Sequence, residues 1–195
     1  MDAEEYILSF DVGIQNLAYS VVCVERNLEK LKKLSAEEFC HRMLTENYLT
    51  VVHSQHVDLN QSPFVHEQVS EKECELAHGK LICDKVAHFL QEFRPMATGF
   101  GLTTCLVEVQ PLTGIISVEA FLHQEFRDIL ERISPNAVHA WLGTTKLTTY
   151  FRKDKITSLT RQALLPFLRP RIEEQHQCDS LVLILFHLYK RMQTR

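Results

Sequence analysis

The chain has 195 residues, of which 45% are hydrophobic and 24% are charged, so it can bury the core of one large domain. Its formal net charge of −4 excludes a protein that is basic over its whole surface. The charge is unevenly divided, because residues 1–140 hold 11 Lys and Arg against 21 Asp and Glu, whereas residues 141–195 hold 10 against 4. A basic C-terminal segment of this kind is either a solvated face or a surface that binds a polyanion.

The N-terminal sequence MDAEEYILSF has neither the segments of a secretory signal nor the Arg-rich composition of a mitochondrial presequence. No apolar run approaches the length of about 18 residues that crosses a membrane. The six cysteines form no C-x-x-C pair, which is typical of reduced intracellular thiols. We therefore expect an intracellular protein with no membrane partner. A zinc site is a weak alternative, because its four candidate ligands match no zinc-finger spacing and share one helical pattern; they are Cys74, His78, Cys83 and His88.

The first part of the chain is rich in β-forming runs. Residues 6–11 and 17–25 flank the turn DVGIQN, so they predict a hairpin. Residues 27–47 are charged, with leucines at roughly helical spacing, and they predict one or two short helices. Residues 48–59 alternate and are β-branched, which predicts a third strand.

The rest of the chain alternates between helical and strand patterns. Apolar residues recur at helical spacing as far as Phe93, which predicts a long helix that ends before Pro95 and a loop over 95–102. The remaining patterns predict a strand at 103–108, a helix at 114–133, a strand at 136–142, a helix around 155–165 and a final helix at 173–192. This order predicts a single α/β domain over residues 1–195, with an enlarged acidic region at about 25–100.

Three carboxylates lie in apolar surroundings. Asp11 and Glu108 each end an apolar strand, and Asp179 lies in the final helix inside the run QCDSLVLIL. Carboxylates beside an apolar core are costly unless they are paired or bound to metal, and an oxygen ligand set favours Mg²⁺ or Mn²⁺ over zinc. His176 precedes Asp179 by three residues and therefore shares its helix face.

Each of these residues also has a purely structural interpretation. Asp11 could cap the turn at Gly13, and Glu108 could be a surface residue at a strand end. His176 could be solvated in the first helical turn. Asp179 could pair with Arg169 or Arg171.

The three blocks together are similar to the active-site blocks of RuvC-like Holliday junction resolvases, especially the poxvirus and fungal mitochondrial branch. The first block, DVGIQNLAYSVV, matches the family pattern at Asp11, Gly13, Asn16 and Ala18. The second, LVEVQP, matches at Glu108, Gln110 and Pro111, and the third, HQCDS, matches at His176, Asp179 and Ser180. His176 stands where poxvirus members usually have aspartate, although other RuvC-like enzymes use histidine there.

The resemblance implies an RNase H-like fold, with a mixed five-stranded sheet flanked by helices on both faces. It also implies a homodimer that hydrolyses DNA phosphodiesters at four-way junctions, using two Mg²⁺ ions about 4 Å apart, with Mn²⁺ able to substitute. Asp11 would bridge the metals, Glu108 and Asp179 would complete their shells, and His176 would bind metal or orient water. A viral origin would place the protein at replication sites in the host cytoplasm or nucleus.

The basic segment before the final helix offers groups for DNA binding. Its cations could contact phosphates, and its two aromatic residues could stack on bases at the branch point or pack against the sheet. These residues are Lys146, Arg152, Lys153, Lys155 and Arg161, with Tyr150 and Phe151.

Three other functions are compatible with parts of this pattern. An ATPase of the actin and sugar-kinase type also begins with Asp-x-Gly, but it needs a duplicated second domain that 195 residues cannot supply. A non-catalytic DNA-binding module would not need carboxylates in apolar surroundings. A nuclease of the same fold that acts on flaps or RNA hybrids is the principal alternative.

Overall fold

The computed structural model describes residues 4–13, 16–25, 27–58, 71–109, 116–168 and 174–194, except for the side chains of 58, 71–82, 116 and 117. Five strands and seven helical segments lie in these ranges. In chain order they are β1 (Glu5–Val12), β2 (Asn16–Val24), η1 (Glu29–Leu31), α1 (Ala36–Thr45), β3 (Leu49–Asp58), α2 (Glu71–Phe100), β4 (Thr104–Glu108), α3 (Ile116–Glu125), β5 (Leu130–Ile133), α4 (Pro135–Trp141), α5 (Thr149–Leu164) and α6 (Glu174–Gln193).

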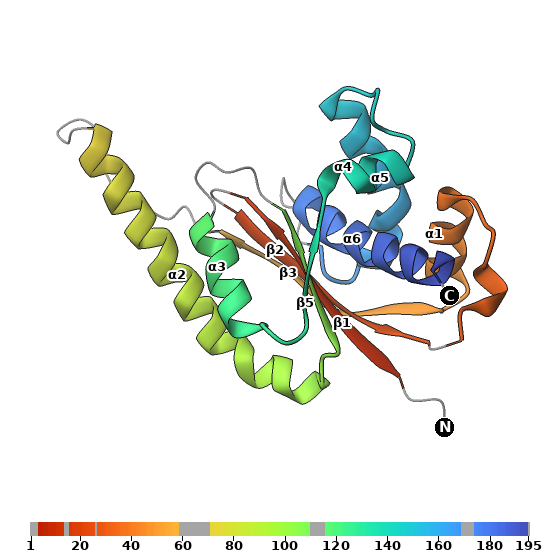
Figure 1. Cartoon of the computed structure of the whole chain (residues 1–195), viewed down its shortest axis with the longest axis horizontal. Coiled ribbons are helices and arrows are strands. Elements are labelled where there is room, and N and C mark those ends of the chain that lie inside the picture. The colour runs from red at the N-terminus through yellow and green to blue at the C-terminus, as the bar shows by residue number, and fades with distance from the viewer. Residues whose placement is uncertain are drawn as a thin grey trace.

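The strands form one mixed sheet in the order β3-β2-β1-β4-β5. The first three strands are antiparallel neighbours, and β4 and β5 run parallel to β1. Helices α2 and α3 cover one face of the sheet, while α1, α4, α5 and α6 lie on the other (Figure 1). The predicted hairpin and the mixed five-stranded sheet between helical layers are therefore confirmed.

Strand alternation divides the core into two clusters, one on each face. On β1, Leu8 and Phe10 pack into the cluster under α2 and α3, whereas Ile7 packs into the cluster around α6. The odd-numbered residues of β1 therefore face α6. Most of α6 is buried because other helices cover it as well as the sheet, which explains its long apolar run.

The predicted end of the long helix at Pro95 is wrong, because α2 continues through this residue to Phe100. Proline removes one helical hydrogen bond and costs about 3 kcal/mol inside a helix. Met96, Ala97 and Phe100 continue the apolar face of α2 beyond the proline, and this packing against the sheet offsets that cost. Figure 1 shows α2 changing direction towards its C-terminal end, as expected for a proline kink.

The predicted helix at 114–133 and strand at 136–142 are also wrong in part. The helix α3 ends at Glu125, and the fifth strand is Leu130–Ile133, an edge strand that pairs with β4. Its two central residues are exposed, so it lacks the apolar alternation that identifies strands. Residues 135–141 form α4 instead, because Pro135 stands at the helix start, where its missing N–H costs nothing.

The basic segment is more helical than expected. Helix α5 spans Thr149–Leu164, so it begins about six residues before the predicted position.

Among the residues that the structure describes, no helix is long and apolar enough to cross a membrane.

Candidate active site

The carboxyl ends of β1 and β4 bring the first two candidate residues together. These parallel strands pair in register as far as Phe10 and Val107, so the next residues, Asp11 and Glu108, are neighbours at the sheet edge. Glu108 follows Leu106 by two positions, and Leu106 belongs to the cluster around α6. Both carboxylates therefore lie on the α6 face.

The start of α6 places His176 and Asp179 over this edge. His176 Nδ1 lies 2.7 Å from Asp11 Oδ2, and Gln175 Nε2 donates a hydrogen bond of 2.8 Å to Asp179 Oδ1. One ligand atom from each of Asp11, His176 and Asp179 lies within 4.8 Å of the others. These residues could therefore hold one metal ion, and carboxylate oxygens with an imidazole nitrogen suit a divalent cation.

The contact with Asp11 fixes the proton of His176. An ionised carboxylate only accepts hydrogen bonds, so Nδ1 of His176 carries the proton and donates it to Asp11. In the neutral ring, Nε2 then bears a lone pair that can ligate metal or accept a proton. The hydrogen bond from His176 to Asp11 also raises the pKa of His176.

The site concentrates negative charge in a buried place. Burial, followed by the charge of Asp11, raises the pKa of Asp179 to about 7. Two carboxylates this close repel one another when both are ionised, and a divalent cation is the kind of partner that offsets this repulsion. The chemistry of the donor set therefore fits a metal centre.

A cavity of 180 Å³ opens at the cluster. Glu108 lines it together with Asp11 and Asp179, although Glu108 is not one of the three residues within 4.8 Å. Two cationic residues of α5, Arg152 and Lys153, also line the cavity. The cavity thus places negative and positive groups around one space, which suits an anionic substrate bound next to a metal.

The site also contains residues that sequence reasoning missed. His139 of α4 lines the same cavity, and its pKa is lowered by burial and by the charge of Arg152. His56 of β3 stacks on His176, with ring centroids 5.7 Å apart and planes inclined by 24°. His56 and Ser54 are two residues apart on β3 and therefore point to the same face of the sheet. This alternation in the sequence could have predicted that His56 faces α6.

A row of buried serines fixes α6 on the sheet. Ser9, Ser20 and Ser54 stand directly opposite one another on the three antiparallel strands. Ser180 Oγ of α6 lies 2.7 Å from Ser20 Oγ, and the Ser180 carbonyl accepts a hydrogen bond from Ser9. Gln177 Nε2 donates to Ser54 Oγ over 3.0 Å. Because serine is small, the helix backbone approaches the strands closely while these buried polar groups keep their partners.

The predicted DNA-binding cations differ in their surroundings. Arg152 and Lys153 face the cavity, and Lys146 is exposed before α5. Lys155 pairs with Glu37 at 2.5 Å and donates to the carbonyl oxygen of Leu142 over 3.0 Å. Arg161 pairs with Glu174. The structure therefore brings only two of the five cations onto the cavity itself.

The two aromatic residues of the basic segment lie in the first turn of α5. Tyr150 is 74% exposed and Phe151 is 56% exposed, and their rings contact each other with centroids 5.5 Å apart. The alternative that they pack against the sheet is therefore wrong. They stand next in sequence to Arg152 and Lys153, which line the cavity.

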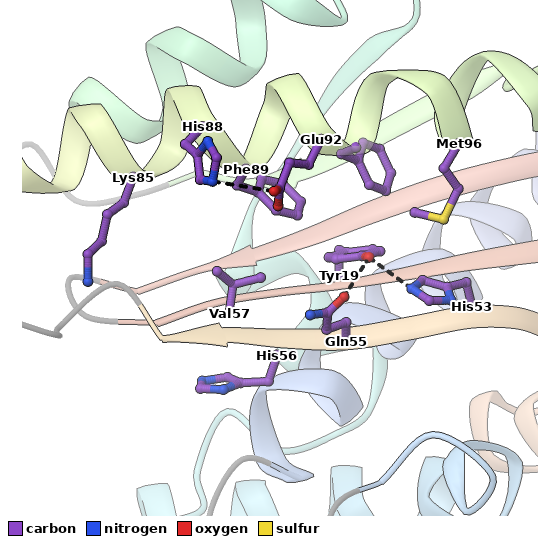
Figure 2. Close-up of a pocket in the computed structure, with 11 residues that line it drawn as sticks. Tyr19, His53, Gln55, His56, Val57, Lys85, His88, Phe89, Glu92 and Met96 are labelled. Atoms are coloured by element: carbon purple, nitrogen blue, oxygen red, sulfur yellow. Dashed lines mark hydrogen bonds and ion pairs between the residues drawn. The ribbon is translucent and has the colours of Figure 1, made fainter.

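A second cavity of 520 Å³ lies on the opposite face of the sheet, between α2 and the strands β2 and β3 (Figure 2). Tyr19, Phe89 and Phe93 form its apolar wall. The Tyr19 hydroxyl lies 2.9 Å from His53 Nε2 and donates to Gln55 Oε1 over 3.1 Å. This cavity lacks the carboxylate cluster among the residues that the structure describes.

Several alternatives from the sequence concern residues outside the described ranges. Arg169 and Arg171, the suggested partners of Asp179, are outside them, and so are Gln110 and Pro111 of the second block. The side chains of Cys74 and His78 are likewise not described. Of the four candidate zinc ligands, the structure therefore describes the side chains of Cys83 and His88, both on α2. His88 lies 3.3 Å from Glu92.

The fold of the chain is similar to that of proteins of known structure. The sequence matches no known family model. It also matches no curated protein. Solved structures nevertheless share the arrangement of the sheet and helices over nearly the whole chain, and they define a RuvC-type, RNase H-like fold. The fold that the three sequence blocks imply is thereby confirmed.

Three of these structures are informative. RuvC from Thermus thermophilus has a TM-score of 0.53 and 19% identity, and the match covers 97% of each chain. The Holliday junction resolvase of fowlpox virus has a TM-score of 0.56 and 14% identity over 95% of this chain and 99% of its own. The yeast mitochondrial Holliday junction resolvase Ydc2 has a TM-score of 0.51 and 14% identity over 97% of this chain and 81% of its own.

Proposed function

We propose that this protein is a metal-dependent DNA endonuclease that cleaves four-way (Holliday) junctions. The observation that carries this proposal is the cluster of Asp11, His176 and Asp179 at the edge of a RuvC-type sheet, whose two carboxylates line a cavity together with Arg152 and Lys153. The proteins with the same fold support the junction as substrate, because two are named Holliday junction resolvases and RuvC has been solved with a Holliday junction substrate.

The acidic cluster would hold the metal. Asp11 and Asp179 supply carboxylate oxygens, Glu108 supplies a third from the same cavity, and His176 supplies a ring nitrogen. We propose Mg²⁺ as the physiological ion, two per active site, with Mn²⁺ able to replace it. Bound there, the metal would polarise the phosphodiester and lower the pKa of the attacking water.

The protein's own groups would position the proton and the phosphate. His176, with Nδ1–H held by Asp11, presents Nε2 either as a metal ligand or as the acceptor of a proton from water. Arg152 and Lys153 would bind phosphate oxygens in the cavity that they line. The attacking water and the scissile phosphate would then meet in this cavity.

The exposed start of α5 would contact the DNA beyond the scissile phosphate. Tyr150 and Phe151 offer ring faces that can stack on bases unpaired at a branch point, and Lys146 offers a nearby charge. Lys155 and Arg161 would contribute less, because Glu37 and Glu174 already neutralise them. We also propose a homodimer, because a four-way junction has two equivalent strands and a two-fold dimer brings two identical sites to them.

A comparison of substrates tests the proposed function. Purified protein with Mg²⁺ or Mn²⁺ is given a four-way junction, a flap, an RNA–DNA hybrid or a linear duplex of the same arm sequence. We expect the junction to be cut fastest, into paired nicked duplexes. Faster cleavage of the flap or hybrid would overturn the junction assignment in favour of another nuclease of this fold.

A further inference from the structure

The α6 face of the sheet contains a row of three residues around the His176 ring. Strand pairing sets Asp11 directly opposite Ala18, and Ala18 directly opposite His56. These three residues therefore lie side by side on β1, β2 and β3 and point to the same face. His176 contacts both ends of the row, through Nδ1 at Asp11 and through its ring face at His56.

The row extends over three neighbouring strands and has a small residue at its centre. Neighbouring strands are about 4.8 Å apart, so the two ends of a three-residue row are separated by about 10 Å. Ala18 in the centre is fully buried and carries a single methyl group. A larger side chain there would compete for the space between Asp11 and His56 that the His176 ring spans.

The ring of His56 is itself held in place. His56 Nε2 lies 3.0 Å from Asn16 Oδ1, and an amide oxygen only accepts, so His56 donates this hydrogen bond. Asn16 begins β2 and lies diagonally across from His56 in the antiparallel register. Figure 2 shows the ring of His56 on the side of β3 that faces away from α2, although His56 also contributes to the lining of the cavity under that helix, together with Gln55 and Val57.

We infer that His56 is a positioning residue for His176, oriented by Asn16, and that Ala18 leaves the space that this contact requires. The inference rests on the proposed function and extends it. The stacked ring restricts His176 to the orientation in which Nδ1 meets Asp11, so that Nε2 is presented with its lone pair. His56 acts through His176 and is not assigned any contact with metal or substrate. Residues that orient a metal-binding histidine typically change metal affinity or activity about 10- to 100-fold when they are altered.

The test compares two substitutions in the full-length protein. His56→Leu removes the stacked ring, whereas His56→Phe keeps a flat ring and loses the hydrogen bond to Asn16. His53→Gln is the matched control, because His53 lies on the same strand and contacts Tyr19 on the opposite face. If His56→Leu fails to fold, Asn16→Ala replaces it, because that variant releases the His56 ring without removing it.

The first measurement is the ring ¹⁵N spectrum of the metal-free protein at one pH. The signals of His176 are identified by their absence from the spectrum of His176→Gln. We expect one tautomer, protonated at Nδ1, in the wild type, in His56→Phe and in His53→Gln. We expect His56→Leu to show a mixture of tautomers or exchange-broadened signals.

The second measurement is single-turnover junction cleavage with Mg²⁺. His56→Leu should cleave at least about 10-fold more slowly with unchanged junction affinity, and His56→Phe should keep most of the rate. Wild-type His176 signals and a wild-type rate in His56→Leu would overturn the inference. A wild-type protein that cuts no junction would refute the proposed function, whereas an altered tautomer in His56→Leu would still support the positioning role.

Discussion

His176 Nδ1 lies 2.7 Å from Asp11 Oδ2, although 165 residues separate them in the chain. This contact joins the first strand of the sheet to the last helix at the point where the carboxylates gather. The same helix meets β1 again through Ser180 and Ser9, and finally through Arg191 and Glu5. Three contacts along one strand therefore fix the direction of α6 and with it the geometry of the site.

The acidic cluster should bind divalent cations without DNA. We expect Asp179→Asn to weaken Mn²⁺ binding by at least about tenfold, because it replaces a charged oxygen ligand with a neutral amide. Isothermal titration calorimetry on the full-length protein measures this effect. Asp154→Asn is the control, because Asp154 is exposed on α5. Equal Mn²⁺ affinity in the wild type and Asp179→Asn would show that the ion binds elsewhere.

The two cations on the cavity wall should dominate the salt dependence of junction binding. Replacing both Arg152 and Lys153 with Gln removes up to two phosphate contacts and should reduce the slope of log K against log salt by about 1.8. Binding in Ca²⁺ at several salt concentrations measures the slope. Replacing both Lys155 and Arg161 with Gln should change it less, because both cations are paired with carboxylates. A larger change of slope in the Lys155 and Arg161 variant than in the Arg152 and Lys153 variant would place the DNA on another face of the protein.

The serine row should stabilise the contact between α6 and the sheet. Ser180→Ala removes the hydroxyl that lies 2.7 Å from Ser20 Oγ and should lower the free energy of unfolding by about 1 kcal/mol. Ser180→Leu should cost about 1–3 kcal/mol through overpacking, and it should also weaken metal binding by displacing α6. Urea unfolding measures both variants, with Ser158→Ala on the exposed side of α5 as control. Wild-type stability in Ser180→Leu would show that the row is loosely packed.

The ion pair at the other end of α6 should make stability depend on pH. Arg191 donates two hydrogen bonds to Glu5, of 2.6 and 2.7 Å. This hydrogen bonding is the main cause that lowers the pKa of Glu5. A carboxyl whose pKa is lower in the folded protein contributes stability above its unfolded pKa of about 4.3. That contribution is lost as the pH falls through the folded value.

Arg191→Met should therefore lower the free energy of unfolding at pH 7, and the difference from the wild type should shrink below about pH 4. Urea unfolding at pH 7, 5, 4 and 3 measures it. Glu29→Gln is the control, because Glu29 forms an exposed pair with Lys32 and should behave like the wild type. A difference that stays constant down to pH 3 would contradict the role of the ion pair.

Sequence periodicity was sufficient to predict how the carboxylates approach each other. Asp11 and Glu108 end strands whose alternation turns them to one face, and His176 and Asp179 share a helix face by their spacing of three. The same patterns predicted the order of elements as far as α3, but not the positions of β5 and α4. These features depend on local repeats, which the sequence displays directly.

Other features depend on contacts between distant segments. The edge strand β5 has exposed central residues and no alternation, and α2 passes through Pro95 only because its apolar face continues beyond it. The position of His56 beside His176 depends on the register between β2 and β3 and on where α6 crosses the sheet, and neither can be read from the sequence. The exposure of Tyr150 and Phe151 likewise depended on where α5 begins.

Junction cleavage by Asp11→Asn tests the central claim most directly. This substitution removes one charge from the cluster that could hold the metal and leaves the cationic wall of the cavity unchanged. Wild-type protein and the variant are compared on a four-way junction with Mg²⁺, and their junction affinities are compared in Ca²⁺. We predict that the wild type cuts the junction, while Asp11→Asn binds it with similar affinity and does not cut. An Asp11→Asn protein that cleaves at the wild-type rate would contradict the account.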